Sequence, residues 1–343
     1  MRHLLNTLFV TTEDAYLALD GENIVVTRGQ LPLGRFPLHT LSAIISFSYA
    51  GASPALMGAC AQRSISLTFC TPRGRFLARS LGESHGNVLL RRAQYRIADD
   101  PEQSCRIARN FIFGKIYNAR WSVERTRRDH ALRVNTDRLE AVSGQLKALL
   151  PAVASVRSLE ALRGLEGTAA AIYFAVMDDM ILRDKSDFFF HGRSRRPPLD
   201  NMNALLSFAY SLLAHDCASA LEAVGLDSYV GFLHRDRPGR ASLSLDLMEE
   251  LRPCMADRFV LTLIHNRMVS PNDFQHRESG AVLMTDEARR TFLKAWQSKK
   301  QEVLTHPYLK EKLPWGMVPY VQALLLARYL RNDLDGYPPF LWK

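Results

Sequence analysis

The sequence predicts an α+β protein in which a β-rich N-terminal domain precedes a larger, mostly α-helical domain. Short apolar and β-branched runs separated by turn residues fill the N-terminal part of the chain. From Val88 onward, apolar residues recur at spacings of three and four, which is the period of an amphipathic helix. This change of pattern lies near residue 85, so the predicted domains are residues 1–85 and 86–343.

The N-terminal part carries the strand signals. Pairs such as Val25-Val26 and Ile44-Ile45 favour strands, because β-branched side chains fit a pleated surface. Turn residues such as Asp20-Gly21 separate the runs. The predicted strands are Leu5–Val10, Ala15–Leu19, Asn23–Arg28, Leu41–Phe47 and Ile65–Phe69, with one helix at Pro54–Gln62 and a linker at Gly82–Gly86.

The rest of the chain carries the helical signals. Leu89-Leu90, Ala93 and Ile97 begin the pattern, and Ile107, Phe111, Ile112 and Ile116 continue it. Further helices are predicted at Asn135–Leu150, Ser158–Leu182, Asn201–Val224, Ser242–Arg267, Asp286–Leu304 and Met317–Arg331. The segment after Asn332, which contains Gly336-Tyr-Pro-Pro-Phe340, is expected to be extended and loosely held.

Composition and charge narrow the class of protein. The net charge of +9 and the pI of about 9.4 favour an anionic partner, of which nucleic acid is the commonest. The five cysteines are dispersed without a CxxC pair, which argues against a disulfide framework and a thiolate zinc site and favours buried thiols. The sequence contains no uncharged apolar run long enough to predict a membrane span. The polar segment Thr11–Asp14 comes too early for a secretory signal. We expect a cytoplasmic protein with no membrane partner.

One candidate for chemistry is Glu166, which lies in Gly164-Leu-Glu-Gly167 at the start of a run of small residues. Small neighbours allow another backbone or a nucleic-acid strand to approach closely. Tyr173 is seven residues further on and shares a helix face with Glu166. Taken alone, however, this pattern fits a solvated glutamate on an amphipathic helix better than a functional one.

A second candidate segment joins a polar turn to an acidic helix. His234 lies in the turn Gly231–Arg240, and Asp246, Glu249 and Glu250 follow on a predicted helix at spacings that make them neighbours. Carboxylates packed together repel unless a cation lies among them or one is protonated. A solvated acidic face with His234 in an ordinary loop explains the segment equally well.

This set of side chains restricts the possible chemistry. Carboxylates with one imidazole and no thiolate suit Mg²⁺ or Mn²⁺ better than structural zinc, and such sites support phosphodiester chemistry. The sequence has no P-loop, HExxH, dinucleotide-binding glycine motif or GxSxG motif.

Basic residues cluster in two places. One helical stretch interleaves Tyr117 and Trp121 with Lys115, Arg120, Arg125, Arg127 and Arg128, and a second cluster follows the aromatic run Phe188–His191 with Arg193, Arg195 and Arg196. These clusters fit a surface that follows a phosphate backbone. A solvated face fits the first equally well, and buried aromatics are the better interpretation of the Phe run. The candidate DNA contacts are Arg125, Arg128, Tyr173, Arg193 and Arg240.

Together, these segments resemble the CRISPR-associated spacer-acquisition integrase family, and within it the type I-C branch. The resemblance spans almost the whole chain, and the order and spacing of its blocks make it specific. The blocks are Leu5–Val10 with Ala18–Glu22, Gly164–Phe174, Arg196–Tyr210, Gly231–Pro253 and Gly280–Ala288.

The resemblance implies a metal-dependent DNA endonuclease and integrase. Its metal would be Mg²⁺ or Mn²⁺ held by Glu166, His234 and Glu249, with Asp246 as a further catalytic residue near the ion. Its substrates would be double-stranded DNA, namely a captured fragment and the CRISPR repeat. Members form homodimers and assemble with a small CRISPR-associated partner protein, and we assign dimerisation to residues 1–85.

The implied reaction is attack by the 3′-hydroxyl of the captured fragment on a phosphodiester at the repeat boundary. Two alternatives stay open. The same site could use water, as in a branched-DNA or repair nuclease, or the chain could be a non-catalytic DNA-binding scaffold whose acidic residues form a solvated face.

Overall fold

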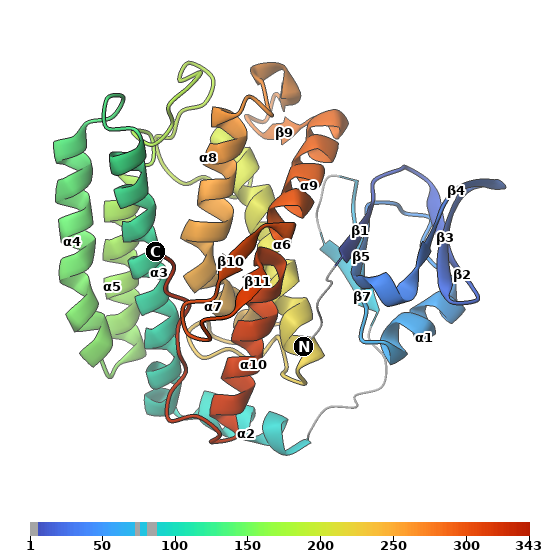
Figure 1. The fold of residues 1–343 in the computed structure, drawn as a ribbon, viewed down its shortest axis with the longest axis horizontal. Coiled ribbons are helices and arrows are strands. Elements are labelled where there is room, and N and C mark those ends of the chain that lie inside the picture. The colour runs from blue at the N-terminus through green and yellow to red at the C-terminus, as the bar shows by residue number, and fades with distance from the viewer. Residues whose placement is uncertain (1–5, 73–75, 81–87) are drawn as a thin grey trace. The chain divides into compact units, whose positions relative to one another are not determined.

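The computed structural model describes residues 6–72, 76–80 and 88–343. These residues are 53% helical and 15% strand, with a strand-rich region before a helical one (Figure 1). The predicted α+β class, in that order, is confirmed. The chain forms two compact units, one from residues 1–85 and 293–302 and the other from residues 86–292 and 303–343.

The described residues up to Ser80 form two sheets and one α-helix. In the larger sheet the strand order is β1-β5-β6-β7, with β7 antiparallel to the others, and β2-β3-β4 form an antiparallel sheet. The elements are β1 (Asn6–Val10), β2 (Ala15–Asp20), β3 (Asn23–Arg28), β4 (Leu31–Pro37), β5 (Leu41–Ser46), α1 (Pro54–Gln62), β6 (Ser66–Cys70) and β7 (Phe76–Ser80).

Both sheets and α1 contribute to one hydrophobic core. Alternate residues of a strand point to opposite faces, so Leu17 and Ile24 are buried while Tyr16 is exposed. Leu56 of α1 and Leu67 of β6 complete the centre of this core. The alternate apolar residues that predicted the strands are therefore the ones buried in this core.

Two strands of this unit were missed by the sequence-based prediction. β4 has exposed residues along nearly its whole length, so its apolar residues do not alternate with buried positions and give no period-two signal. β7 is a short strand at the edge of its sheet. The predicted linker Gly82–Gly86 and residue Leu5 lie outside the described residues.

The helical unit is built around α3, which packs against α4, α5 and α7, while α6 packs against α7 and α10 (Figure 1). Its helices are α2 (Val88–Asp99), α3 (Pro101–Asp129), α4 (Thr136–Ser155), α5 (Leu159–Phe174), α6 (Asn201–Ala223), α7 (Ser242–Leu251), α8 (Arg258–His265), α10 (Val318–Leu330) and the start of α9 (Asp286–Gln301), whose residues from Leu293 onward belong to the other unit. Two short hairpins that the sequence did not predict join them, namely β8 (Phe274–His276) with β9 (Val282–Met284) and β10 (Val303–Thr305) with β11 (Lys312–Pro314).

Capping residues fix where these helices begin. The Asp100 side chain accepts hydrogen bonds from the backbone amides of Glu102 and Gln103, and Pro101 occupies the first turn of α3. The Asp200 carboxylate accepts from the amide of Asn203 in α6 in the same way. These caps satisfy amides that have no partner inside the helix.

Two predicted helices are shorter in the structure. α5 ends at Phe174, although buried Val176, Met177, Met180 and Ile181 extend the apolar spacing, because those residues lie in a series of turns. The predicted helix Ser242–Arg267 is interrupted by a π-helical turn, η2 (Arg252–Asp257). Pro253 has no amide hydrogen to continue the α-helical pattern, and the wider turn accommodates it.

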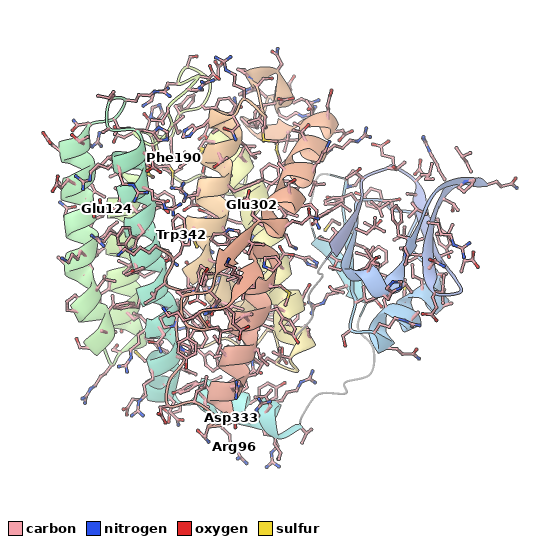
Figure 2. The ribbon with its side chains drawn as sticks, viewed as in Figure 1. Arg96, Glu124, Phe190, Glu302, Asp333 and Trp342 are labelled. Atoms are coloured by element: carbon pink, nitrogen blue, oxygen red, sulfur yellow. The ribbon has the colours of Figure 1, made fainter. Side chains whose placement is uncertain are left out.

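The C-terminal segment is anchored, so the expectation that it is loosely held was wrong. Tyr337 and Phe340 are buried, and the Asn118 amide donates to the Phe340 carbonyl at 2.7 Å. Trp342 lies beside α3, where the Arg125 guanidinium is 4.2 Å from its ring centroid and that of Arg258 is 5.2 Å away (Figure 2).

Two further expectations concern burial. All five cysteines are free and buried, as predicted. Among the described residues, α6 is the one helix long and apolar enough to cross a membrane, and 56% of that stretch is buried inside the protein. A central helix of a globular unit has the same length and composition.

Candidate active site

Three helices of the helical unit bring the first two candidate residues together. Glu166 lies on α5 and Glu249 on α7, and Lys115 of α3 bridges them. The Lys115 ammonium forms an ion pair with Glu166 Oε1 and lies 2.7 Å from Glu249 Oε2. The structure thus joins two acidic residues that are far apart in the sequence, and it does so through a basic residue.

The environment of Glu249 keeps it ionised. Burial raises the pKa of this carboxyl, but the opposing charges of Arg252 and Lys115 outweigh burial and lower the pKa to about 2. Arg252 Nη2 lies 3.0 Å from Glu249 Oε1. Glu249 Oε2 lies 2.7 Å from the Lys115 ammonium. Both oxygens of this ionised carboxylate therefore face a cationic side chain.

His234 and Asp246 form a second pair beside these residues. His234 Nδ1 lies 2.5 Å from Asp246 Oδ1, and Asp246 is completely buried. The same carboxylate accepts the backbone amides of Phe232 at 2.6 Å, Leu233 at 2.9 Å and His234 at 3.0 Å. Asp246 therefore fixes both the loop and the imidazole, and Nε2 is the ring nitrogen left for another partner.

Close backbone approach makes this arrangement possible. A Cβ atom at Gly231 would lie 2.8 Å from the Ser242 Cβ and 2.9 Å from Asp246 Oδ2, so only glycine fits there. The Arg163 side chain of α5 donates to the Leu233 carbonyl at 2.7 Å and ties the loop to the helix that carries Glu166. His234 lies close enough to Glu249 to contribute to the lowering of the pKa of that carboxyl.

Glu250 does not belong to this cluster. It is completely buried on the other side of α7, where the Tyr337 hydroxyl donates to Oε1 at 2.5 Å and the Phe340 amide donates to Oε2 at 2.8 Å. Burial raises its pKa to about 7, because its partners are neutral. Asp246, Glu249 and Glu250 are all buried, so the alternative of a solvated acidic face is wrong.

An open pocket is lined in part by Glu166. Its floor contains Asp257, which accepts hydrogen bonds from Tyr210 at 2.5 Å and Tyr173 at 3.0 Å. Burial raises the pKa of Asp257 to about 6. Four basic side chains line the same pocket, namely Lys115, Arg193, Arg195 and Arg252.

The five candidate DNA contacts do not share one place. Arg193 lines the pocket, where it donates to Asn203 Oδ1 at 2.6 Å and lies over the Tyr210 ring. Arg125 stacks on Trp342, Arg128 pairs with Asp129 at 2.9 Å, and Arg240 bonds the carbonyl of Arg235. Tyr173 is 4% exposed and its hydroxyl donates to Asp257, so its burial argues against the predicted DNA contact. The aromatic run is buried at Phe188 and Phe190, as favoured from the sequence.

The donor set suits a hard divalent cation in its chemistry. It offers two carboxylates, one of them kept ionised by its basic neighbours, and an imidazole oriented by a carboxylate. Among the residues described, no three such side chains stand arranged around a common metal position. The ammonium of Lys115 lies between the two glutamates instead.

Sequence reasoning missed Lys115 and Arg252 as members of the site. Lys115 was grouped with the basic surface of its helix, yet it lies on the buried stripe of α3, between Ile112 and Ala119 at helical spacing. A lysine within an apolar stripe predicts a buried ion pair, and that signal was present in the sequence. For Arg252, the following proline gives only an indirect signal of the helix interruption.

The fold is similar to those of solved structures. The chain resembles a casposase bound to integration product with a TM-score of 0.81 at 22% identity, covering 98% of this chain and 93% of that one. It resembles a CAS1 protein from Thermotoga maritima with a TM-score of 0.80 at 21% identity, covering 98% and 100%. At these identities the likeness shows the fold, which is that of the CAS1 and casposase structures.

Sequence comparison gives the family. Residues 8–298 match the family described as CRISPR associated protein Cas1. The chain is 50% identical over 351 residues to CRISPR-associated endonuclease Cas1 2 of Rhodospirillum rubrum and 47% identical over 343 residues to CRISPR-associated endonuclease Cas1 1 of Chlorobaculum tepidum, with both proteins covered completely in each case. The chain belongs to the Cas1 family of CRISPR-associated endonucleases. The family inferred from the sequence is thereby confirmed.

Proposed function

We propose that this chain is a divalent-metal-dependent DNA integrase that inserts short DNA fragments into a CRISPR array, and that it belongs to the type I-C branch. The observation that carries the proposal is that Glu166 and Glu249 both contact the Lys115 ammonium. His234 is close enough to contribute to the lowered pKa of Glu249. Such a cluster of two carboxylates and an imidazole beside a basic pocket suits phosphodiester chemistry.

Each site residue has a distinct task in this proposal. Glu166, Glu249 and the Nε2 atom of His234 would hold Mg²⁺ or Mn²⁺. Asp246 would act as a positioning residue, because its two oxygens are already engaged by one ring nitrogen and three backbone amides. When bound, the ion would polarise the phosphate, stabilise the developing charge and help to deprotonate the attacking hydroxyl.

The reaction would be a transesterification. The 3′-oxygen of the captured fragment forms a bond to phosphorus, the bond to the leaving 3′-oxygen of the array breaks, and the proton passes to that oxygen. The number of phosphodiester bonds is unchanged, so no energy-rich co-substrate is needed. Arg193, Arg195 and Arg252 would bind phosphate oxygens near the site, while Arg125, Arg128 and Arg240 would bind the backbone further away.

Partners follow from the same proposal. One structural neighbour, similar at a TM-score of 0.81 and 21% identity, is a Cas6-RT-Cas1–Cas2 complex. We propose that this chain likewise forms a homodimer through residues 1–85 and assembles with a small Cas2-type partner on double-stranded DNA. The alternative of a repair or branched-DNA nuclease uses the same residues with water as the nucleophile.

A strand-transfer assay tests the proposal. The substrates are a supercoiled plasmid that carries a repeat-spacer array and a short duplex with free 3′-hydroxyls. We expect Glu166→Ala and His234→Ala to abolish insertion while gel-shift binding of DNA survives. The control is His276→Ala, since His276 is exposed on β8.

Three outcomes would contradict it. Strand transfer at the wild-type rate in either active-site variant would remove these residues from the mechanism. Cleavage of branched DNA without any insertion would favour the repair nuclease. Activity that survives EDTA unchanged would argue for a scaffold without metal chemistry.

A further inference from the structure

Lys115 lies on the buried stripe of α3, in contact with both glutamates of the site. Its side chain is 14% exposed, and its ammonium contacts one carboxylate oxygen of Glu166 and one of Glu249. These are the two glutamates that the proposed function assigns to the metal. The site therefore contains a cation of its own, supplied by the protein.

The burial of Lys115 follows from its place on α3. The neighbouring residue, Gly114, lets α3 approach α7 so closely that a Cβ atom there would lie 2.8 Å from the Glu250 Cβ. An ammonium removed from water is stable only with opposite charges nearby, and two carboxylates that face each other repel unless a cation separates them. Lys115, Glu166 and Glu249 thus stabilise one another in the absence of a metal ion.

The same contacts place Lys115 in competition with the metal ion. A divalent ion that binds both glutamates needs the carboxylate oxygens that the ammonium now holds, and two cations at such short range repel strongly. The lysine side chain has a flexible four-carbon stem. The pocket that Lys115 shares with Glu166 and Arg193 offers a space into which the ammonium can move.

We propose that Lys115 is the internal counter-ion of the metal-free site, and that its ammonium must leave Glu166 and Glu249 before a divalent ion can bind. This inference rests on the proposed function. It makes Lys115 a positioning residue that keeps the two glutamates together and lowers the apparent affinity for metal. The apparent dissociation constant rises in proportion as the competent, lysine-out state becomes less populated.

The test is Mn²⁺ binding by the purified full chain, followed by electron paramagnetic resonance of the free ion. Lys115→Met removes the competing charge and keeps an unbranched side chain of similar length. We expect it to bind Mn²⁺ at least about tenfold more tightly than the wild type, which corresponds to about 1.4 kcal/mol. The matched control is Arg127→Met on the same helix, which removes a residue paired with Glu124 and Glu140 outside the site and should leave the affinity unchanged.

Unchanged or weaker Mn²⁺ binding in Lys115→Met would overturn the inference. If the wild type binds Mn²⁺ in a manner that Glu166→Ala abolishes, the proposed metal site stands whatever Lys115→Met does. If neither the wild type nor Lys115→Met binds the ion, both proposals fail. The two proposals therefore fail separately.

A second measurement uses the wild type and does not depend on how the variant folds. Amine-reactive labelling followed by mass spectrometry reports the accessibility of each lysine. We expect Mg²⁺ to increase the labelling rate of Lys115 several-fold and to leave that of Lys147, exposed on α4, unchanged. A Lys115 labelling rate that Mg²⁺ leaves unchanged or reduces, at a concentration that saturates the site, would contradict displacement.

Discussion

Glu249 and Glu250 are adjacent in the sequence and both are buried, yet their surroundings differ in charge. Glu249 faces Lys115 and Arg252, and its pKa falls to about 2 in spite of burial. Glu250 faces the hydroxyl of Tyr337 and the amide of Gln322, and burial raises its pKa to about 7. One turn of α7 thus carries an ionised carboxylate on one side and, on the other, a carboxyl group whose pKa lies near neutral pH.

The contrast shows that burial alone does not define an active carboxylate. A buried acid with neutral donors stabilises the packing of a segment, here the C-terminal residues Tyr337 and Phe340. A buried acid with cationic neighbours keeps its charge in a place where another cation can bind. The charge of the neighbouring groups, more than the extent of burial, separates a structural carboxyl group from a functional one. Ion pairs with a purely structural role also keep a buried carboxylate charged.

Substituting each glutamate by glutamine is the strongest way to break the comparison. Glu249→Gln removes the charge but keeps an oxygen for Arg252, so we expect strand transfer to fall roughly 10³-fold or more with little change in fold, because several kcal/mol of charge stabilisation is lost. Glu250→Gln should keep activity within about tenfold. Its effect should be a loss of roughly 1–3 kcal/mol of stability, because an amide N–H replaces an acceptor of the Phe340 amide.

Single-turnover strand transfer and urea denaturation of both variants provide the measurement. Equal losses of activity in Glu249→Gln and Glu250→Gln would show that the two acids share one role. Amine-reactive labelling of Lys115 offers an internal check on Glu249→Gln, since Lys115 should keep its ion pair with Glu166 in this variant.

Much of the fold follows from local sequence, and the reasons for the exceptions are physical. Pro54 and the run up to Gln62 predicted α1 with the correct limits, because the proline fixes the first turn. β4 could not be found, since an exposed edge strand has no buried face to give it a period. The break at Arg252 depends on Pro253, and the tertiary contacts that keep the chain helical on both sides of it are not local.

The candidate site divides in the same way. Glu166, His234 and Glu249 were candidates from their local sequence, but only the family resemblance joined them in one metal site, because their spacing along the chain carries no periodic signal. Sequence spacing placed both Glu249 and Glu250 beside Asp246 on the predicted helix, but it could not tell that the two glutamates have different partners. Lys115 could have been found from its position on the buried stripe of α3, since that argument needs only helical geometry.

The pH dependence of stability sharpens the comparison further. Because folding raises the pKa of Glu250 from 4.5 to about 7, the folded state binds more protons than the unfolded state between these values, and stability falls as the pH rises through this window. The effect of this group is on the order of 3 kcal/mol. Asp257, whose pKa is raised to about 6, acts in the same direction, so the quantity to measure is the difference between the wild type and Glu250→Gln.

Urea denaturation at pH 5 and pH 8 gives that difference. The wild type should lose more stability over this range than Glu250→Gln does. Glu249 has the opposite sign, because its lowered pKa makes its contribution disappear only as the pH falls below 4.5 toward 2. An identical pH dependence in the wild type and in Glu250→Gln would mean that Tyr337, Gln322 and Phe340 hold Glu250 as a carboxylate throughout.

Asp246, the third buried acid of α7, gives the smallest expected effect and the finest distinction. Among the described residues, the donors to its carboxylate come from the His234 loop, so it should act on the metal through the orientation of the imidazole. In Asp246→Asn, an amide group opposes at least one of these donors, whichever way the side chain is turned. We expect Mn²⁺ affinity to weaken by about 10–100-fold, as is typical when the partner of a metal-binding histidine is lost. That change is opposite in sign to the one expected for Lys115→Met. A loss of Mn²⁺ affinity as large as the one measured for Glu249→Gln would make Asp246 a direct ligand. An unchanged Mn²⁺ affinity would remove Asp246 from the site.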